Sequence, residues 1–243
     1  MASTSEIGHA KNVANFQDLI EFVTAYGATY NPSKNSLKLP QLIALKASAD
    51  ATLADVITKN TNYNNKVNER ITAFSGLKSL STRLVNALQT TDATTETIGN
   101  AKTFNRKMQG KKASSSQTPT DPNTPAPNTI STSQQSYDQL IQHLAGLTTV
   151  LEAETSYTPN ETDLQVATLQ TKIADLTAKN TAVATAYASI SNSRIARNET
   201  LYSSSTGLVE TANEVKKYIK SVFGASSPQF AQVKGIQFKI IKN

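Results

Sequence analysis

The chain has 243 residues, enough for one large domain or two small ones, and it lacks cysteine, which excludes disulfide bonds, thiolate metal sites and cysteine nucleophiles. Hydrophobic residues make up 38% of the sequence and tryptophan is absent, which indicates a lean core typical of long helices that each bury one apolar stripe. The formal net charge is +6, and the basic surplus lies in residues 1–115.

The N-terminal sequence MASTSEIGHAKNVANF has no apolar segment of the kind that secretory signal peptides carry. No run approaches the roughly 18 apolar residues that a transmembrane helix needs. We therefore expect a soluble, cytoplasmic protein, with export by a leaderless route left open.

The first predicted element is a short helix that opens at Asn15 and ends at Gly27. Its apolar residues fall on one stripe: Phe16, Leu19, Ile20, Val23 and Tyr26. A similar stripe recurs later in the chain: Tyr137, Leu140, Ile141, Leu144 and Leu147.

Two long segments follow these short helices, and both keep apolar residues at spacings of three and four. Such a pattern predicts long helices packed as a bundle or coiled coil. The second segment would span roughly 85 Å as one helix of about 57 residues. The polar clusters NTNYNN and SISNS interrupt the segments, so we expect either two helices in each or one helix kinked near 60–64 and 187–193.

Further elements are predicted near the end of each long segment. A helix over 93–109 takes Asp92 as its N-cap and ends at Gly110, and Gly224 ends the last helix of the chain. The sequence GIQFKIIKN alternates apolar and polar residues, which predicts a short strand or an extended tail.

The stretch at 111–135 is rich in Pro, Ser and Thr, and we interpret it as a flexible linker or long surface loop. TPAP and TPTDP also favour an extended chain, so a proline-rich docking ligand is the alternative. No PxxP flanked by a fixed arginine supports that alternative.

The segments on either side of this stretch resemble each other at a constant offset of 127 positions. The identical pairs are Tyr30/Tyr157, Pro32/Pro159, Leu37/Leu164, Leu42/Leu169, Ala47/Ala174, Val56/Val183, Arg70/Arg197 and Asn86/Asn213. Upstream, FQDLIEF resembles YDQLIQH at an offset of 121. The pattern predicts an all-α, elongated helical bundle made of two tandem, pseudo-symmetric helical repeats, at 1–110 and at 136–243 with an extended C-terminal tail.

We expect the two repeats to pack on each other along their apolar stripes, because each alone offers a small, marginally stable core. The alternative is that another chain completes the stripes.

Several phrases, GHAKNVANFQDLI, YGATYNPSKNSLKL, PNETDLQVATL, SRIARNETLY and KSVFGASSPQFAQV, resemble a family of leaderless, all-helical tandem-repeat proteins common in Bacteroidota. The resemblance covers nearly the whole chain apart from 111–135. It implies an α-helical protein without a leader. No activity is assigned to the family, so no catalytic residue is carried over.

The sequence offers little catalytic chemistry. His9 and His143 have no partner at metal-ligand spacing, and we expect surface or interface roles for both. Phosphate-binding glycine motifs and a nucleophile elbow are absent. Glu210 and Glu214 lie one helical turn apart beside three lysines, which is typical of an exposed charged face. We predict a non-enzyme without cofactor or metal.

Arg70 and Arg197 fall on the apolar stripes at matching places, where an unpaired charge is costly. One interpretation is structural, with each guanidinium reaching solvent or pairing with Glu69, with Glu199 or with helix-end carbonyls. The other is a pair of pseudo-symmetric anion-binding positions.

Each repeat also ends in a basic stretch without acidic residues, and aromatic residues are interspersed in the second stretch. The residues are Lys102, Arg106, Lys107, Lys111 and Lys112 in the first repeat, and Lys216, Lys217 and Lys220 in the second. Basic and aromatic residues together are typical of nucleic-acid or anionic-surface binding, whereas basic helix C-termini also arise from the helix dipole.

The leading hypothesis is therefore a structural or scaffolding protein that acts through protein–protein contacts or self-association. Binding of nucleic acid or an anionic surface through the basic ends is the alternative. A helical membrane-active protein is a third hypothesis. Such a protein needs an apolar hairpin, and this sequence has none.

Overall fold

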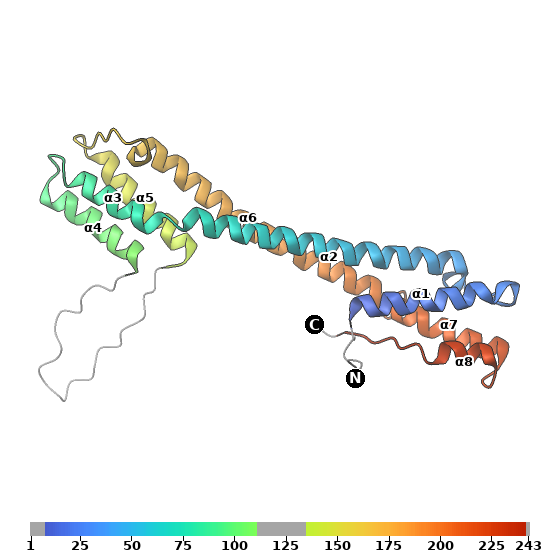
Figure 1. Ribbon diagram of the computed structural model, residues 1–243. Coiled ribbons are helices and arrows are strands. Elements are labelled where there is room, and N and C mark those ends of the chain that lie inside the picture. The colour runs from blue at the N-terminus through green and yellow to red at the C-terminus, as the bar shows by residue number, and fades with distance from the viewer. Residues whose placement is uncertain (1–7, 111–134, 242–243) are drawn as a thin grey trace, which may run out of the picture. The chain divides into compact units, whose positions relative to one another are not determined.

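In a computed structural model, residues 8–110 and 135–241 are described, and every regular element in these ranges is a helix (Figure 1). The all-α class predicted from the sequence is confirmed. The predicted linker lies outside the described residues except for Gln135. The described chain divides into two compact units, and each takes residues from both sides of this segment.

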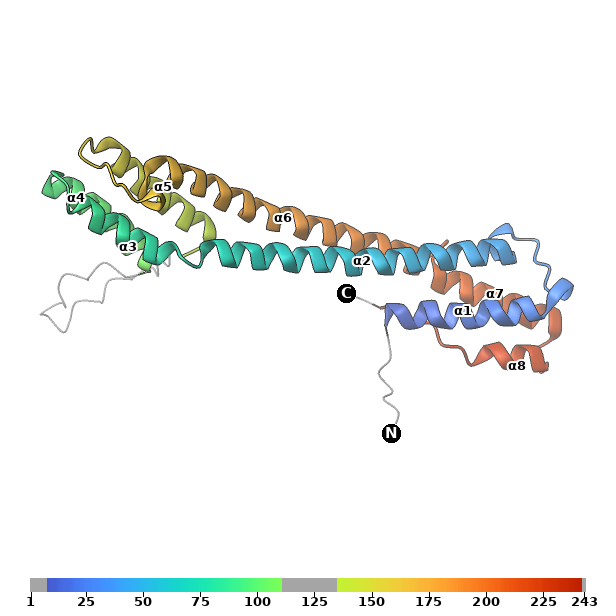
Figure 2. The same cartoon turned by 45° about the horizontal axis from the view of Figure 1, so that its top comes forward.

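The first unit comprises Met1–Tyr63 and Ala186–Asn243. Its elements are α1 (His9–Ala25), the 3-10 turns Gly27–Thr29 and Asn35–Leu37, the first part of α2 (Leu39–Phe74), the last part of α6 (Val166–Tyr202), α7 (Leu208–Phe223) and α8 (Pro228–Lys234). Figures 1 and 2 both show α1 alongside α7 and α8. Their shared core includes Phe16, Leu42, Leu208, Ile219 and Val233.

The second unit comprises Asn64–Thr185. Its elements are the rest of α2, α3 (Leu77–Leu88), α4 (Thr95–Gln109), α5 (Tyr137–Ala153), the 3-10 turn Thr162–Leu164 and the first part of α6. Helix α4 packs against both α3 and α5. The core of this unit includes Phe74, Leu84, Met108, Leu147 and Leu169.

The compact units differ from the division predicted at 111–135. Each core combines residues from before Gly110 with residues from after Gln135, because α2 and α6 each contribute to both units. Burial of one leucine side chain stabilises a fold by about 1.5–3 kcal/mol. The stabilisation of each unit therefore depends on both parts of the chain.

The two long helices are continuous where a break or kink was expected. Helix α2 runs without interruption through NTNYNN, and α6 runs through SISNS. The Asn and Thr side chains of NTNYNN are exposed, whereas Ser193 of SISNS is buried and its hydroxyl donates to the Asp55 carboxylate at 2.6 Å. Neither cluster interrupts its helix. The chain leaves the helical path instead near Gly76, after α2, and near Gly207, after α6.

Several predicted helix ends are confirmed. Helix α4 ends at Gly110 with φ +73° and α7 ends at Gly224 with φ +93°, a conformation that favours glycine. The start of α4 differs by two residues, because the cap is Thr94, whose hydroxyl accepts a hydrogen bond from the Thr97 amide at 3.2 Å. Asp92 is not the N-cap.

Helix α1 begins earlier than predicted, at His9. Asn15 lies inside it with its side chain 9% exposed, and its amide donates to the Gln237 carbonyl at 2.6 Å. The first helices of the two sequence segments begin at His9 and Tyr137, so they are 128 positions apart rather than the 121 that the FQDLIEF match suggested.

The same tyrosine hydrogen bond precedes each long helix. Tyr30 donates to the Leu37 carbonyl at 2.8 Å, and Tyr157 donates to the Leu164 carbonyl at 3.0 Å. Both rings are buried, and burial raises the pKa of Tyr30 and raises that of Tyr157 to about 12. Each hydroxyl thus closes the connection that leads into α2 or α6.

The C-terminal tail is extended. A short strand or an extended tail was predicted here, and the extended tail is confirmed. Residues 236–241 form no strand in the described part of the chain. Asn12 on α1 pairs with Lys239 of the tail through both backbone groups, donating at 2.7 Å and accepting at 3.0 Å. The short helix α8 before the tail was not predicted.

Candidate functional site

Arg70 occupies the buried side of α2 in the second unit. Its Nη1 donates to the Asn180 Oδ1 at 3.0 Å, and its guanidinium carbon lies 4.0 Å from the centre of the Tyr137 ring. The expected pairing with Glu69 does not occur, because Glu69 binds Lys66. The Nε of Arg70 is buried without a hydrogen-bond partner among the described residues. A cation–π contact therefore takes the place of an ion pair.

Arg197 lies on α6 in the first unit and is 7% exposed. Its Nε and Nη2 donate to the Asn198 Oδ1 at 3.1 and 2.8 Å, and not to Glu199. Burial lowers the pKa of Arg197, and burial together with this arginine lowers the pKa of His9. Like Arg70, Arg197 has an amide oxygen rather than a carboxylate as its acceptor within the described ranges.

The basic residues of the first stretch lie on the second half of α4. Lys102, Arg106 and Lys107 are exposed, and none forms an ion pair with another described residue. Lys107 has its Nζ 5.8 Å from the centre of the Phe104 ring. Lys111 and Lys112 lie outside the described residues.

The lysines of the second stretch have different roles. Lys216 donates to the Ile236 carbonyl at 2.8 Å and to the Lys234 carbonyl at 3.2 Å, and burial lowers its pKa. It therefore joins α7 to the end of α8, which is a structural role. Lys217 and Lys220 are exposed. Glu214, expected on a charged face beside them, binds Lys34 at 2.6 Å.

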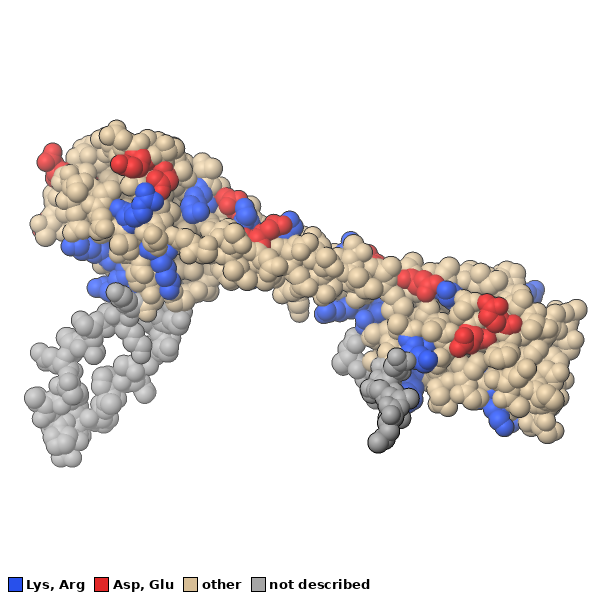
Figure 3. Space-filling model, viewed as in Figure 1, with Lys and Arg blue, Asp and Glu red and all other residues tan. Residues whose placement is uncertain are grey.

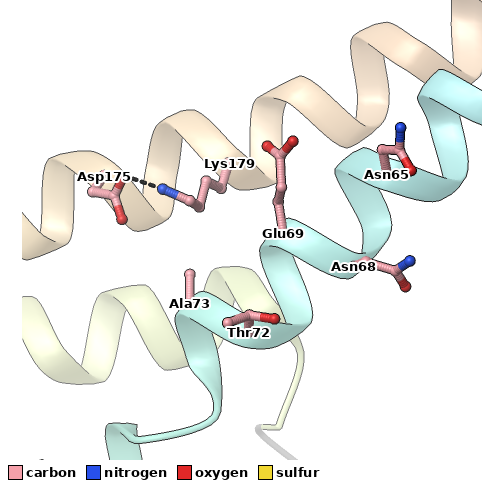
Figure 4. A pocket seen from close by; sticks show the side chains of 7 residues that line it. All are labelled: Asn65, Asn68, Glu69, Thr72, Ala73, Asp175 and Lys179. Atoms are coloured by element: carbon pink, nitrogen blue, oxygen red, sulfur yellow. Dashed lines mark hydrogen bonds and ion pairs between the residues drawn. The ribbon is translucent and has the colours of Figure 1, made fainter.

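A groove of about 600 Å³ lies between α2 and α6 in the second unit (Figure 4). Its lining residues are Asn65, Asn68, Glu69, Thr72, Ala73, Asp175 and Lys179. Lys179 is tied to Asp175 by an ion pair, as the dashed line in Figure 4 marks. Glu69 is tied to Lys66 at 2.9 Å, so both carboxylates already have a cation. The groove is open to solvent and does not enclose a ligand.

A second depression, of about 630 Å³, lies where α3 begins and α6 begins. Leu80 and Leu169 supply apolar surface, and Arg83 forms an ion pair with Asp163 at its edge. Hydrogen bonding to Arg83 lowers the pKa of Asp163. This carboxylate is therefore ionised at neutral pH and bound to its arginine.

The exposed sides of the two long helices are rich in small uncharged residues, and their exposed charged residues are Asp50, Asp55 and Glu69 on α2 and Asp175, Arg194 and Glu199 on α6. We define the outer face of α2 as Ile43, Ala44, Ala47, Asp50, Ala51, Ala54, Ile57, Thr58, Thr61, Asn64, Asn65, Asn68, Ile71 and Thr72, all exposed. The outer face of α6 is Ala167, Gln170, Thr171, Ala174, Thr177, Ala178, Thr181, Ala184, Thr185, Ala188, Ser191, Asn192, Ile195, Asn198 and Glu199. Within these sets Asp50 and Glu199 carry charge, and other exposed charged residues lie beside the sets on the same helices. In the view of Figure 3 most of the surface is uncharged.

Exposed apolar side chains distinguish the outer face of α2. Ile43, Ile57 and Ile71 are 52, 68 and 50% exposed, whereas α6 exposes Ile195 at 65% and Tyr187 at 59%. Sequence reasoning missed these faces because it followed the apolar stripe that forms the core. The same helical period places small uncharged residues on the side of each helix opposite the apolar stripe, and this pattern is visible in the sequence.

His143, for which a surface or interface role was expected, is buried on α5 at 5% exposure. Its Nε2 is buried and has no hydrogen-bond partner among the described residues. Burial and the nearby Lys107 lower its pKa. His9, by contrast, shares a hydrogen bond of 2.7 Å with the Tyr202 hydroxyl.

No group of three or more His, Asp or Glu side chains is placed to hold a metal ion within 8–110 and 135–241. In the same ranges no helix combines the length and apolar character that crossing a bilayer requires. Comparison with known family models, curated proteins and solved structures gave no match.

Proposed function

We propose that this chain is a non-enzymatic structural or scaffolding protein that binds other proteins along the outer faces of α2 and α6. The observation that carries the proposal is the predominance of small uncharged residues on these faces together with the exposed isoleucines of α2. The centres of protein interfaces are depleted of charged residues. Covering Ala, Thr and Ile costs little desolvation and little side-chain entropy.

A photo-crosslinking amino acid at position 57 of the full chain tests this proposal. In cells, Ile57 replaced by p-benzoylphenylalanine should give a discrete covalent protein adduct on irradiation. The matched control is the same replacement at Ile240, which is 63% exposed but lies in the tail. Absence of adducts at position 57 and also at positions 188 and 195 of α6 would contradict the proposal.

The basic face of α4 favours a second candidate, binding to nucleic acid or an anionic surface. Lys102, Arg106 and Lys107 are exposed and free of ion pairs to described residues, so their charge is available to phosphates. Replacing Lys102 and Arg106 by glutamine should weaken any binding to DNA or RNA and reduce its salt dependence. Unchanged binding in the double variant would exclude α4 as the contact.

We further propose that the chain consists of two tandem, pseudo-symmetric helical repeats in an elongated bundle, and that it belongs to the Bacteroidota family that its phrases resemble. The repeated tyrosine hydrogen bonds of Tyr30 and Tyr157 support the duplication. So do the 3-10 turns Asn35–Leu37 and Thr162–Leu164, which are 127 positions apart.

A further inference from the structure

Two asparagines of α1 bind the backbone of the C-terminal tail, which Figure 1 shows running back along α1 from α8. Asn12 donates to the Lys239 carbonyl at 2.7 Å and accepts from the Lys239 amide at 3.0 Å. Asn15, about one turn further along α1, donates to the Gln237 carbonyl at 2.6 Å. An asparagine that binds both polar groups of one residue replaces a neighbouring β-strand, and it does so whatever side chain that residue carries.

The side chains of the tail alternate like those of a strand. Ile236 and Phe238 pack against the core of the first unit, whereas Gln237 and Lys239 are exposed. The Phe238 ring lies edge-on to the Phe16 ring, with the ring centres 6.5 Å apart. The tail is therefore bound through its backbone and through two apolar side chains that are separated by one residue.

Lys216 of α7 also contacts the tail in both of these ways. Its Nζ donates to the Ile236 carbonyl at 2.8 Å and lies 5.9 Å from the centre of the Phe238 ring. The residues that bind the tail thus come from two helices. We call them the tail-binding surface: Asn12, Asn15, Phe16 and Lys216.

The tail is less buried than the end of the helix before it. Val233 of α8 is completely buried, whereas no residue from 236 to 241 is buried and Ile240 is 63% exposed. Stabilisation by apolar side chains grows with the area that they remove from water, so Ile236 and Phe238 each contribute less than full burial would give. Gly235 lies between α8 and the tail, and glycine is the residue that most readily changes its backbone conformation.

Exchange of the tail for another extended segment leaves the buried polar groups satisfied. Asn12 and Asn15 are 4 and 9% exposed with the tail in place, and Phe16 is fully buried. A buried amide without a hydrogen-bond partner is costly, so removal of the tail alone is unfavourable. A segment that offers the same backbone groups restores these bonds and competes with the tail directly.

We propose that the tail-binding surface recognises an extended segment of a partner protein with apolar residues at alternate positions, and that this segment displaces the tail. The tail itself shows what the segment must supply, namely two apolar side chains separated by one residue and the free backbone groups of an extended chain. Main-chain hydrogen bonds combined with contacts to alternate side chains are a recurrent mode of peptide recognition. The inference goes beyond the proposed function, since this surface lies on α1 and α7 and not on the outer faces of α2 and α6.

A labelled peptide with the sequence of residues 235–241, GIQFKII, tests the proposal by fluorescence anisotropy with the full-length chain. The wild type should bind it weakly, because its own tail competes at an effective concentration on the order of millimolar. Phe238→Ala and Ile236→Ala should each bind it about 10-fold more tightly, because each variant loses an apolar anchor of its tail. Lys239→Ala is the matched control and should bind as the wild type does, since that side chain is exposed.

Changes in the peptide test the mode of binding without altering the protein. GIQAKII, and GIQFKII methylated on the backbone nitrogen of its lysine, should each bind the Phe238→Ala chain about 10-fold more weakly than GIQFKII does. The first peptide lacks the ring, and the second lacks the amide hydrogen that Asn12 accepts. Equal binding of the three peptides, or no gain of affinity in either tail variant, would overturn the proposal. Wild-type dimers that disappear in Phe238→Ala would make the tail of a second copy the occupant and overturn a partner protein.

Discussion

Two arginines hold positive charge within helical packing, and each has an amide oxygen as its hydrogen-bond acceptor. Arg70 uses Asn180 and the Tyr137 ring, and Arg197 uses Asn198. A guanidinium loses hydration when it is buried, and an amide dipole replaces only part of it. Both positions were found from the sequence because they interrupt the apolar stripes. Their acceptors were not predicted: Asn180 is 110 positions from Arg70, and Asn198 is the residue next to Arg197.

His143 gives the molecule a pH-dependent stability that belongs to a single side chain. Burial and Lys107 lower its pKa below the usual 6.5, so the folded chain binds fewer protons here than the unfolded chain. Stability rises with pH wherever the unfolded state binds more protons. The free energy of unfolding should therefore fall as the pH drops below about 6.5.

Urea unfolding at pH 7.5 and at pH 5.5 measures this loss. In His143→Gln the difference between the two pH values should be smaller than in the wild type, because glutamine does not titrate. His9 also has a lowered pKa, so part of the loss should remain in that variant. An unchanged pH dependence would show that His143 contributes nothing to it.

At the scale of helices, α4 and α5 depend on one glycine. A Cβ at Gly146 of α5 would lie 2.4 Å from the Cε1 of Phe104, far inside van der Waals contact. Glycine inside a helix costs about 1 kcal/mol relative to alanine. The close approach of Phe104 therefore explains a residue that the helix alone would disfavour.

Gly146→Ala should destabilise the chain by about 1–3 kcal/mol, because Phe104 must move or α4 must shift. Gly99 is the matched control, since it lies inside α4 with no atom within 4 Å of its missing Cβ. Gly99→Ala should instead stabilise by about 0.5–1 kcal/mol through helix propensity. Chemical denaturation of both variants decides; stabilisation by Gly146→Ala would show that Phe104 adapts without cost.

The helices themselves followed from periodicity, glycine and local capping. The ends at Gly110 and Gly224 were predicted because a positive φ after a helix favours glycine, and this is a local requirement. The start of α1 was not, because Asn15 is a good cap by type but binds the distant Gln237 carbonyl instead. Helix α8 was missed because its seven residues make only about two turns, too few to establish a periodic pattern, although Ser227 before a proline marks its start.

At the scale of the whole chain, both compact units need both sequence segments. The core of the first unit pairs Phe16 and Leu42 with Leu208 and Ile219, and that of the second pairs Leu84 with Leu169. The sequence predicted that the segments pack together, because their stripes are too lean alone. It did not predict which parts meet, since periodicity along a helix carries no information on partners. The outer faces were missed for the same reason.

Cutting the chain between Gly110 and Gln135 tests this sharing of cores. A protease site placed there and cleaved after folding should leave two fragments that elute together and unfold in one transition. Each fragment purified alone should be less helical than the mixture, as circular dichroism would show. Fragments that separate on a sizing column without loss of helicity would contradict shared cores. An uncleaved chain with the same insertion is the control.

Asn12 on α1 donates a hydrogen bond to the Lys239 carbonyl, so this contact forms only after the end of the chain has been synthesised on the ribosome. The second unit lies within Asn64–Thr185, so its residues emerge while the C-terminal part of the chain is still being made. Helix α1, by contrast, must wait for α7 and the tail, whose residues appear near the end of translation. Its apolar side, with Phe16 and Leu19 fully buried in the finished fold, stays open during that interval. The nascent chain therefore needs protection at its beginning for longer than at its middle.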